Sequence, residues 1–89
     1  MMIKFFAYVR DYTHKKVIEM EPCETVEELL KVLSSRYGKP FKTNVFPDNK
    51  LSDEMIILVN GRHIDHCDGV HTKLMDEDVI CIIPVVAGG

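Results

Sequence analysis

The chain has 89 residues, a formal net charge of -3 and 46% hydrophobic residues, which suits one small globular domain and excludes an intrinsically disordered chain. The acidic balance argues against binding to a nucleic acid backbone, because phosphates select basic surfaces. No apolar stretch approaches the roughly 20 residues that a membrane-spanning helix requires.

Cysteine usage and the N-terminal segment bear on the compartment. Cys23, Cys67 and Cys81 are an odd number at irregular spacing, which argues against a disulfide framework. The first ten residues, MMIKFFAYVR, hold an apolar stretch that is too short and too interrupted by charge for a signal peptide. We therefore expect a cytoplasmic protein with no membrane and no nucleic acid partner.

The N-terminal residues predict two strands. Residues 3–10, IKFFAYVR, alternate with a period of two, which is typical of a strand. Residues 11–14 predict a turn, and residues 15–20, KKVIEM, predict a second strand in a hairpin with the first. Phe6 and Tyr8 fall on the face that should meet solvent, so they either pack across strands or form an exposed apolar patch for a partner.

The clearest helix is predicted over residues 25–37. Thr25 is a suitable N-cap and Glu28 completes a capping box. Gly38 suits the C-cap, and Pro40 prevents continuation of the helix. One buried stripe is expected at helical spacing, formed by Val26, Leu29, Leu30, Leu33 and Tyr37.

Residues 39–54 show no clear period and predict a long loop, with room for a short turn of helix. The continuous apolar run 55–59 predicts a strand buried on both faces. Asn60-Gly61 is a strong hairpin signal and leads into a brief return strand over 62–64. The run 79–86 predicts a last, central strand, again nearly all apolar.

The order of these elements predicts an α+β domain, a mixed sheet with one main helix packed on one face. If the last strand lies beside the first, the two must run parallel, because the chain has crossed the sheet between them. That arrangement is the ubiquitin-like β-grasp. We expect a single domain over residues 1–89, with a flexible C-terminal tail over about 84–89.

Three stretches, FFAYVRD, LVNGRHI and DGVHTKLMDEDVICIIPVVAGG, resemble the MoaD/ThiS family of ubiquitin-like sulfur carriers, and most closely its branch of molybdopterin synthase small subunits (MoaD). In the closing stretch Leu74, Asp76, Asp78 and Val79 are in register with the family. The likeness spans most of the chain and is weakest over about 38–54. Gly-Gly is a weak motif alone and a strong one at a C-terminus after such a strand.

The resemblance implies a chemistry for the tail. An ATP-dependent activating enzyme of the MoeB type adenylates the Gly89 carboxylate. Sulfur from a cysteine desulfurase or rhodanese type of donor then displaces AMP and leaves a covalent thiocarboxylate. The molybdopterin synthase large subunit (MoaE type) finally delivers that sulfur to a pterin precursor of the molybdenum cofactor. The chain itself binds no cofactor in this scheme and is a non-catalytic small subunit.

The resemblance also assigns positions to the tail and to docking. Pro84, Val86, Ala87 and Gly88 would thread the partner's active site, where a residue without a Cβ passes a narrow channel most readily. The resemblance assigns partner docking to Phe6, Ile83 and His63. His63 stands where the family usually has an apolar residue.

Other reactive side chains give weaker signals. His63, His66, Cys67 and His71 match no zinc spacing, so we expect no metal site. Cys81 lies in an apolar run and is expected in the core, which leaves Cys67 as the one candidate sulfur relay. Residues 76–78 are adjacent carboxylates that predict a solvated turn.

Two other functions stay open. In a ubiquitin-like protein modifier, a lysine amine attacks the same activated Gly89. In a plain β-grasp interaction module the two glycines have no role. Within the sulfur carrier reading, a thiamine, tungsten-cofactor or other sulfur pathway also stays open.

Overall fold

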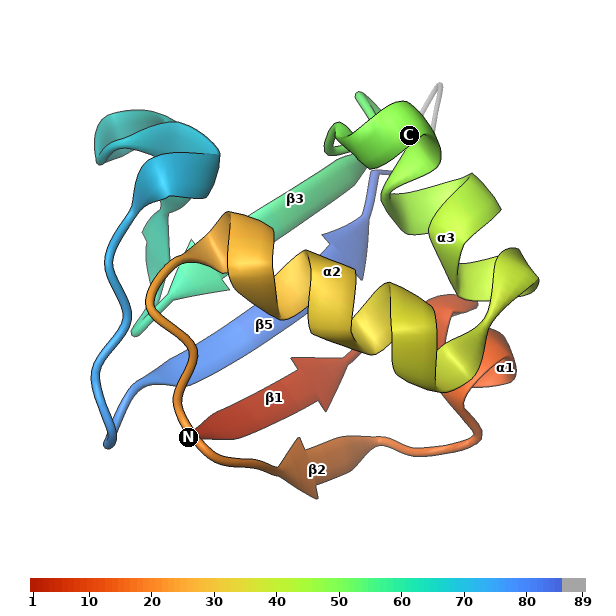
Figure 1. Ribbon diagram of the computed structural model, residues 1–89, viewed down its shortest axis with the longest axis horizontal. Helices are drawn as coiled ribbons and strands as arrows, with labels where there is room; N and C mark the ends of the chain where they lie inside the picture. The colour runs from red at the N-terminus through yellow and green to blue at the C-terminus, as the bar shows by residue number, and fades with distance from the viewer. Residues whose placement is uncertain (86–89) are drawn as a thin grey trace.

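The computed structural model describes residues 1–85 and contains a mixed five-stranded sheet (Figure 1). Its strands lie in the order β2-β1-β5-β3-β4. Their bounds are Met2–Phe5 for β1, Val17–Glu19 for β2, Met55–Val59 for β3, Arg62–His63 for β4 and Val79–Pro84 for β5.

Helices cover one face of the sheet. The longest, α2 (Val26–Tyr37), crosses that face, and α3 (Lys39–Val45) lies next to its C-terminal end, as Figure 1 shows. The short helix α1 (Val9–Thr13) follows β1. The described residues also form three 3-10 turns, η1 (Pro47–Asn49), η2 (Ile64–His66) and η3 (Gly69–His71). No helix of the described residues is long and apolar enough to cross a membrane.

The strand pairing confirms the predicted topology. β5 runs parallel to β1, with Ile3 opposite Ile80 and Phe5 opposite Ile82. On its other side β5 pairs antiparallel with β3, so the last strand is central. β2 and β4 close the two edges, each antiparallel to its neighbour. The sheet therefore has the β-grasp order, and the last strand carries the chain toward its C-terminal residues from the middle of the molecule.

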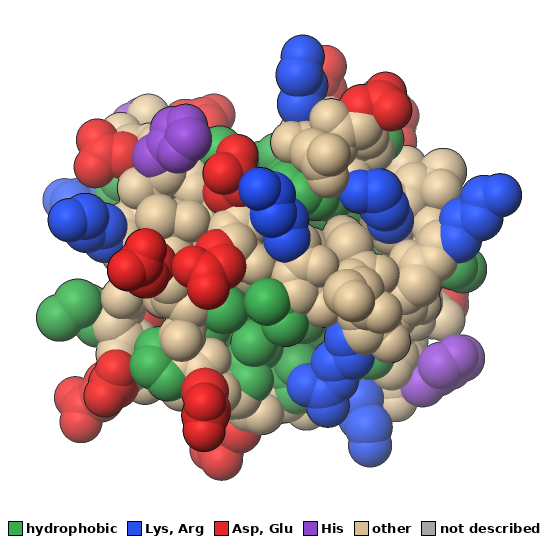
Figure 2. Space-filling model, in the orientation of Figure 1, with side chains coloured by type: hydrophobic (Ala, Val, Ile, Leu, Met, Phe, Trp, Pro, Cys, Tyr) green, Lys and Arg blue, Asp and Glu red, His purple; other side chains and the backbone are tan. Residues whose placement is uncertain are grey.

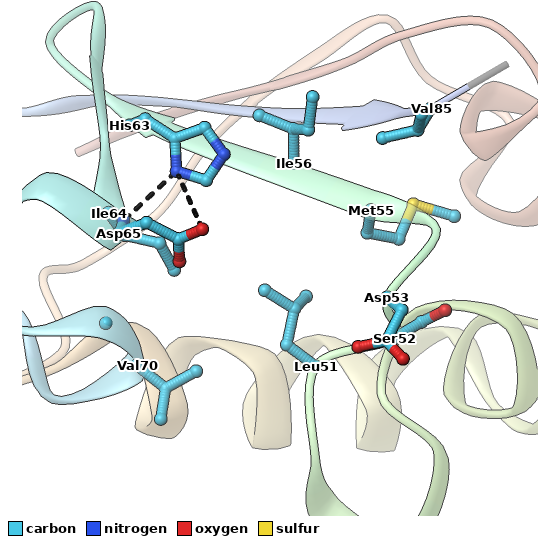
Figure 3. A pocket seen from close by; sticks show the side chains of 11 residues that line it. Leu51, Ser52, Asp53, Met55, Ile56, His63, Ile64, Asp65, Val70 and Val85 are labelled. Atoms are coloured by element: carbon cyan, nitrogen blue, oxygen red, sulfur yellow. Dashed lines mark hydrogen bonds and ion pairs between the residues drawn. The ribbon is translucent and has the colours of Figure 1, made fainter.

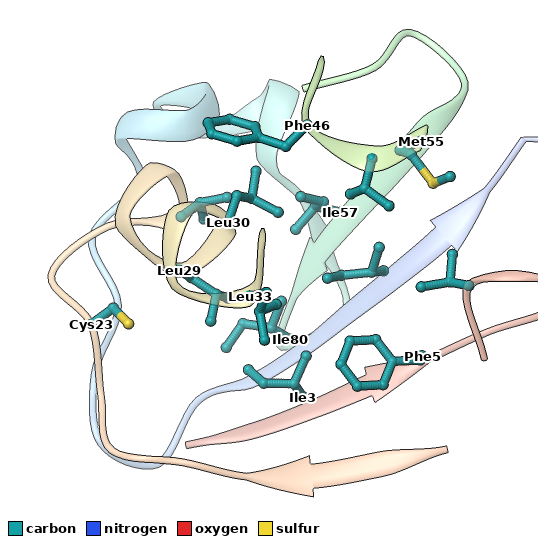
Figure 4. Packing of buried hydrophobic residues seen from close by; sticks show 14 of the residues in the cluster. Ile3, Phe5, Cys23, Leu29, Leu30, Leu33, Phe46, Met55, Ile57 and Ile80 are labelled. Carbon is teal, nitrogen blue, oxygen red and sulfur yellow. The ribbon is translucent and has the colours of Figure 1, made fainter. Parts of the chain in front are cut away.

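The core fills the space between α2 and the sheet (Figure 4). Four of the five predicted stripe residues of α2 are buried, namely Val26, Leu29, Leu30 and Leu33. The fifth, Tyr37, is only partly buried and packs edge-to-face on Phe5, with ring centroids 5.9 Å apart. Charged side chains of both signs are spread over the solvent side of the helices (Figure 2), as an amphipathic helix requires.

The predicted cap of α2 is present. The Thr25 hydroxyl oxygen accepts a hydrogen bond from the Glu28 amide at 3.2 Å. The Glu28 carboxylate accepts in turn from the Glu24 amide at 3.2 Å, one residue before the amide that a capping box uses. The hydroxyl thus satisfies an amide donor that the helix itself leaves without a partner.

The prediction of one strand over residues 3–10 was wrong. β1 ends at Phe5, and Ala7 has a φ of +50°, which breaks the extended chain. Val9 then reaches the core from α1, where it is fully buried. The predicted tight hairpin is therefore replaced by a connection through a helix, although β1 and β2 do pair antiparallel.

The prediction of a long loop over residues 39–54 was also wrong in its first half. α3 begins directly after Gly38, which ends α2 with a φ of +79°. Pro40 lies in the first turn of α3, where a missing N–H breaks no helical hydrogen bond. Phe41 and Val45, four residues apart, are fully buried on one side of α3, which anchors the helix to the core.

Burial of β3 on both faces was predicted and is not observed. In β3 the residues Met55, Ile57 and Val59 are buried, and the two between them are only half-buried. In β5 the same alternation holds, with Ile80, Ile82 and Pro84 buried. The helices cover only one face of this sheet, so the opposite face of its central strands is apolar and partly open.

The predicted last strand over 79–86 ends earlier, at Pro84. The tail that we expected from about residue 84 therefore has its first two residues held by the sheet. Pro84 is buried in β5, and the Val85 amide donates to the Glu54 carbonyl at 2.7 Å. The remaining residues, 86–89, lie outside the described part of the chain.

Candidate docking face and C-terminal segment

The sheet surface turned away from α2 is the candidate docking face, here called the outer face. The strand register places Ile83 opposite Ile56 and Cys81 opposite Leu58 on this side. These four side chains are half-buried. Half-exposed aliphatic side chains on adjacent central strands form a continuous apolar surface, the kind of patch that marks a protein contact.

Phe6 extends the outer face beyond the end of β1. Its amide donates to the Ile82 carbonyl at 3.2 Å, which holds it beside the strand of Ile83. The guanidinium carbon of Arg10 lies 5.8 Å from the centre of the Phe6 ring, and Arg10 Nε donates to the Phe5 carbonyl at 2.9 Å. The aromatic ring is thus held in place by a cation–π contact, close to the strand that leads to the tail.

His63 lies at the opposite border of the outer face, on β4, where it pairs with Leu58. Its Nδ1 accepts a hydrogen bond from the Asp65 amide at 3.0 Å and lies 3.8 Å from the Asp65 carboxylate. The hydrogen bond from the Asp65 amide fixes the orientation of the His63 ring. The His66 ring packs against it edge-to-face, with centroids 6.1 Å apart.

Phe6, Ile83 and His63, the three expected docking residues, therefore belong to three neighbouring parts of one sheet. Phe6 and Ile83 are adjacent, and His63 follows across β3. Their role in docking stays a prediction. The residues expected to react or to thread a partner, Val86, Ala87, Gly88 and Gly89, lie outside the described residues.

The cysteines occupy three environments, one of them unexpected. Cys81 faces outward beside Leu58 and is half-buried, so its expected place in the core was wrong. Cys23 is the buried cysteine, and its burial, followed by the nearby Glu28 carboxylate, raises the pKa of its thiol. Cys67 is exposed. Over residues 1–85, no three His, Cys, Asp or Glu side chains are grouped as a metal site would require.

The acidic segment at 76–78 has a structural part. Asp78 accepts a hydrogen bond from the Asn60 side-chain amide and another from the Met75 amide, each at 2.8 Å. Asn60 Oδ1 in turn accepts from the Val79 amide at 2.9 Å. These bonds tie the turn between β3 and β4 to the start of β5, so Asp78 positions the central strand.

Sequence reasoning missed Ile56, Leu58 and Cys81 as members of the outer face. Each stands in a run in which every residue is apolar, and a run of that kind carries no sign of which side faces outward. The hairpin signal at Asn60-Gly61 could have shown it. A two-residue turn fixes the register of the strand before it, and successive residues of that strand then point to opposite faces.

Comparison with known proteins identifies the chain. The sequence model of the ThiS family matches residues 3–89. The chain belongs to the ThiS family. A putative sulfur carrier protein of Archaeoglobus fulgidus is 37% identical to this ThiS-family chain over 65 residues, 73% of the chain and 74% of that protein. Small archaeal modifier protein 3 of Haloferax volcanii is 32% identical over 89 residues, 98% of the chain and 96% of that protein.

Solved structures agree with the fold of this ThiS-family chain. Small archaeal modifier protein 1 of Methanosarcina acetivorans superposes with a TM-score of 0.84 at 30% identity, covering 99% of the chain and 94% of its own. CysO in the Amycolatopsis orientalis BexX/CysO complex superposes with a TM-score of 0.83 at 26% identity. The match covers 99% of the chain and 98% of that protein. A putative molybdopterin converting factor, subunit 1, of Pyrococcus furiosus superposes with a TM-score of 0.71 at 25% identity. The match covers 96% of the chain and 95% of that protein.

These findings confirm the resemblance seen in the sequence and the β-grasp fold. The chain is a small ubiquitin-like protein of the sulfur carrier and modifier type. By their names, one relative is a sulfur carrier and another is a protein modifier. The choice between sulfur transfer and protein modification depends on the chemistry of the C-terminal residues.

Proposed function

We propose that this chain is a cytoplasmic sulfur carrier whose Gly89 carboxylate is adenylated and then converted to a thiocarboxylate. The observation that carries the proposal is the family match, which runs from residue 3 through Gly89 and so includes both terminal glycines. The 37% identity to a putative sulfur carrier protein supports the same activity.

The chemistry follows from the weakness of a carboxylate as an electrophile. A Gly89 carboxylate oxygen attacks the α-phosphorus of ATP, and pyrophosphate leaves. The outer sulfur of a donor persulfide then adds to the carbonyl carbon, and AMP leaves with the attacking oxygen. A second thiol attacks the donor's sulfur in the resulting acyl disulfide, which frees the thiocarboxylate and leaves a disulfide between the donor and that thiol. One carboxylate oxygen is exchanged for sulfur, and the energy comes from ATP. The activating partner, an adenylating enzyme of the MoeB type, supplies the catalytic groups.

The described residues would present the tail to that enzyme. The central position of β5 and the hydrogen bond from Val85 to Glu54 fix the position of Val85, the last described residue. Docking through Phe6, Ile83 and His63 would place that point at the enzyme's active site. A separate docking surface would add contacts that offset the entropy lost when the two proteins associate.

For the acceptor we propose the pterin precursor of the molybdenum cofactor, reached through a large subunit of the MoaE type. The fold match to a putative molybdopterin converting factor, subunit 1, supports this choice. The sulfur donor would be of the cysteine desulfurase or rhodanese type. A thiamine or other sulfur pathway would use the same carrier chemistry with a different acceptor enzyme.

Protein modification is the second candidate. It is favoured by the match to small archaeal modifier protein 3, which extends over nearly the whole of both chains. Both functions share the adenylated Gly89. They differ in the nucleophile, which is sulfur in the first and a lysine amine in the second.

The test is the intact mass of the chain after incubation with ATP, the adenylating enzyme and a sulfur donor. We expect a gain equal to the exchange of one oxygen for sulfur, located at Gly89 and absent from a chain that lacks Gly89. Isopeptide-linked products in place of that gain would establish the modifier. An unchanged mass with an enzyme that adenylates a known carrier would overturn both, and would leave a plain interaction module.

A further inference from the structure

The two edges of the sheet differ in what lies beside them. At the edge formed by β3 and β4, side chains of these strands, of η2 and η3 and of the segment before β3 surround a cleft of about 360 Å³ (Figure 3). The strand backbone is not free there, because Ile57 is fully buried and the Met55 amide donates to the Ser52 carbonyl at 3.1 Å. At the opposite edge β2 is the last strand, and over residues 1–85 no element lies beyond it (Figure 1).

The backbone of β2 has one free side. The Met20 amide donates to the Met1 carbonyl at 2.9 Å, and the Lys16 carbonyl accepts a hydrogen bond from β1 at 2.8 Å. The even-numbered residues of this segment therefore turn their backbone groups toward β1. Because every second residue of an antiparallel strand faces its partner, the amides and carbonyls of Val17 and Glu19 point away from the sheet. Both residues are exposed, so these groups are open to a further strand.

The two ends of β2 carry charges of opposite sign. Lys15 and Lys16 come directly before the strand, Glu19 is its last residue, and Glu21 follows; all four are exposed. Within residues 1–85 none of the four belongs to an ion pair. Val17, between them, is 44% exposed. Edge strands are usually protected by charges that repel another strand, but here an antiparallel second copy of β2 would meet each charged end with its opposite, whereas a parallel copy in register would meet like with like.

We propose that the free edge of β2 is a homodimer interface, in which β2 of a second copy pairs antiparallel about a two-fold axis at Ile18. Val17 then lies opposite Glu19 of the second copy, and these two residues exchange backbone hydrogen bonds. Lys15 lies opposite Glu21 of the second copy. The symmetry repeats each contact, so the sheet becomes continuous across the two copies. The proposal does not depend on the chemistry at Gly89.

This dimer would leave the outer face open. Ile83 lies on the central strand β5 and His63 on the opposite edge of the sheet from β2. A two-fold axis that relates two antiparallel edge strands is normal to the sheet, so the outer faces of both copies would lie on the same side. Since β2 has only three residues, we expect an association at the weak end of specific protein contacts.

Sedimentation equilibrium of the full chain at neutral pH, at concentrations up to about 1 mM, measures this association. We expect a monomer–dimer equilibrium, and we expect Val17→Pro to abolish it. Proline lacks the amide that would pair with the second copy. That amide points away from β1, so the substitution removes no hydrogen bond of the sheet, and proline is tolerated at such an edge position. Circular dichroism checks that the variant is folded.

Charge reversal separates this pairing from other contacts between copies. Lys15→Glu and Glu21→Lys should each weaken the dimer about tenfold, because like charges then face each other at both symmetric contacts. The double variant should restore the dimer, and an equal mixture of the two single variants should associate as the unaltered chain does. Lys50→Glu is the matched control, because it makes the same charge change at an exposed residue before β3 and should leave the dimer unchanged.

A chain that stays monomeric at every concentration would overturn the proposal. So would a dimer that persists in folded Val17→Pro, or a double variant that associates as weakly as the single ones. A loss in Lys50→Glu equal to that in Lys15→Glu would reduce the effect to net charge and overturn it as well. A dimer that is lost in Ile83→Ala and kept in Val17→Pro would place the contact on the outer face instead.

Discussion

The three cysteines show how the sheet and α2 set the chemistry of single residues. Cys23 is 7% exposed, Cys81 is half-buried on the outer face, and Cys67 is exposed. The thiolate is the reactive form of cysteine. Burial opposes its formation at Cys23, and the Glu28 carboxylate opposes it further, so the pKa of that thiol is raised. The fold thus keeps this thiol out of reach of reagents in solution.

We predict that a soluble alkylating reagent at mildly alkaline pH modifies Cys67 well before Cys23. A raised pKa leaves less thiolate at a given pH, and the surrounding core limits access to what remains. Peptide mapping after timed quenching gives the two rates directly. The unfolded chain in denaturant is the control and should bring the two rates together. Equal rates in the folded chain would mean that Cys23 is not packed as described.

Residues of the outer face were the hardest to read from the sequence. The family resemblance pointed to Phe6, Ile83 and His63, and the structure places all three on one sheet surface. The resemblance did not indicate that Cys81 lies on the outer face. In the run 79–83 each residue is apolar, so hydrophobicity alone does not separate the side packed on α2 from the side left open.

At the scale of elements, α2 is the one whose beginning and end are both determined by local sequence. We predict that Thr25→Ala lowers the free energy of unfolding by about 1 kcal/mol, because the Glu28 amide loses its side-chain acceptor. Urea unfolding followed by circular dichroism measures the change. Thr43→Ala is the matched control, since Thr43 is exposed within α3 and should change stability little. A loss in Thr43→Ala as large as in Thr25→Ala would contradict the capping role.

The elements that the sequence did not reveal are the short helices. α1 has five residues and α3 has seven, too few for a helical period to outweigh other patterns. The alternation of apolar residues in β1 continues by chance through Ala7 to Val9, the first residue of α1, although the backbone has already turned at Ala7. In α3 only Phe41 and Val45 mark the buried side. Both helices are stabilised by tertiary packing, which acts beyond the window of local propensity.

At the scale of the whole molecule, the two faces of the sheet divide stability from recognition. The inner face is packed against α2 and α3 in one core (Figure 4). The outer face has no covering element among residues 1–85 and keeps its apolar side chains half-open. A chain of this size has few buried residues to spare, so leaving such a surface open is consistent with a partner that covers it.

Adjacent residues of β5 test this division. Ile82 is fully buried on the inner face and Ile83 is half-buried on the outer face. We predict that Ile82→Ala lowers the free energy of unfolding by about 2–5 kcal/mol, and that Ile83→Ala lowers it by about 1 kcal/mol or less. The order reverses for partner binding. With the activating enzyme below saturation, Ile83→Ala should slow thiocarboxylate formation at least about fivefold, as expected for a residue at the centre of an interface.

The comparison is informative only while both variants are folded, so the rates are measured at a temperature where unfolding curves show Ile82→Ala to be native. There its rate should match that of the unaltered chain, because its side chain does not reach the outer surface. A slow Ile82→Ala and an unaffected Ile83→Ala would place the docking surface elsewhere. Comparison of Ile82→Ala with Ile83→Ala thus separates a loss of fold from a loss of partner binding, because successive side chains of a strand point to opposite faces.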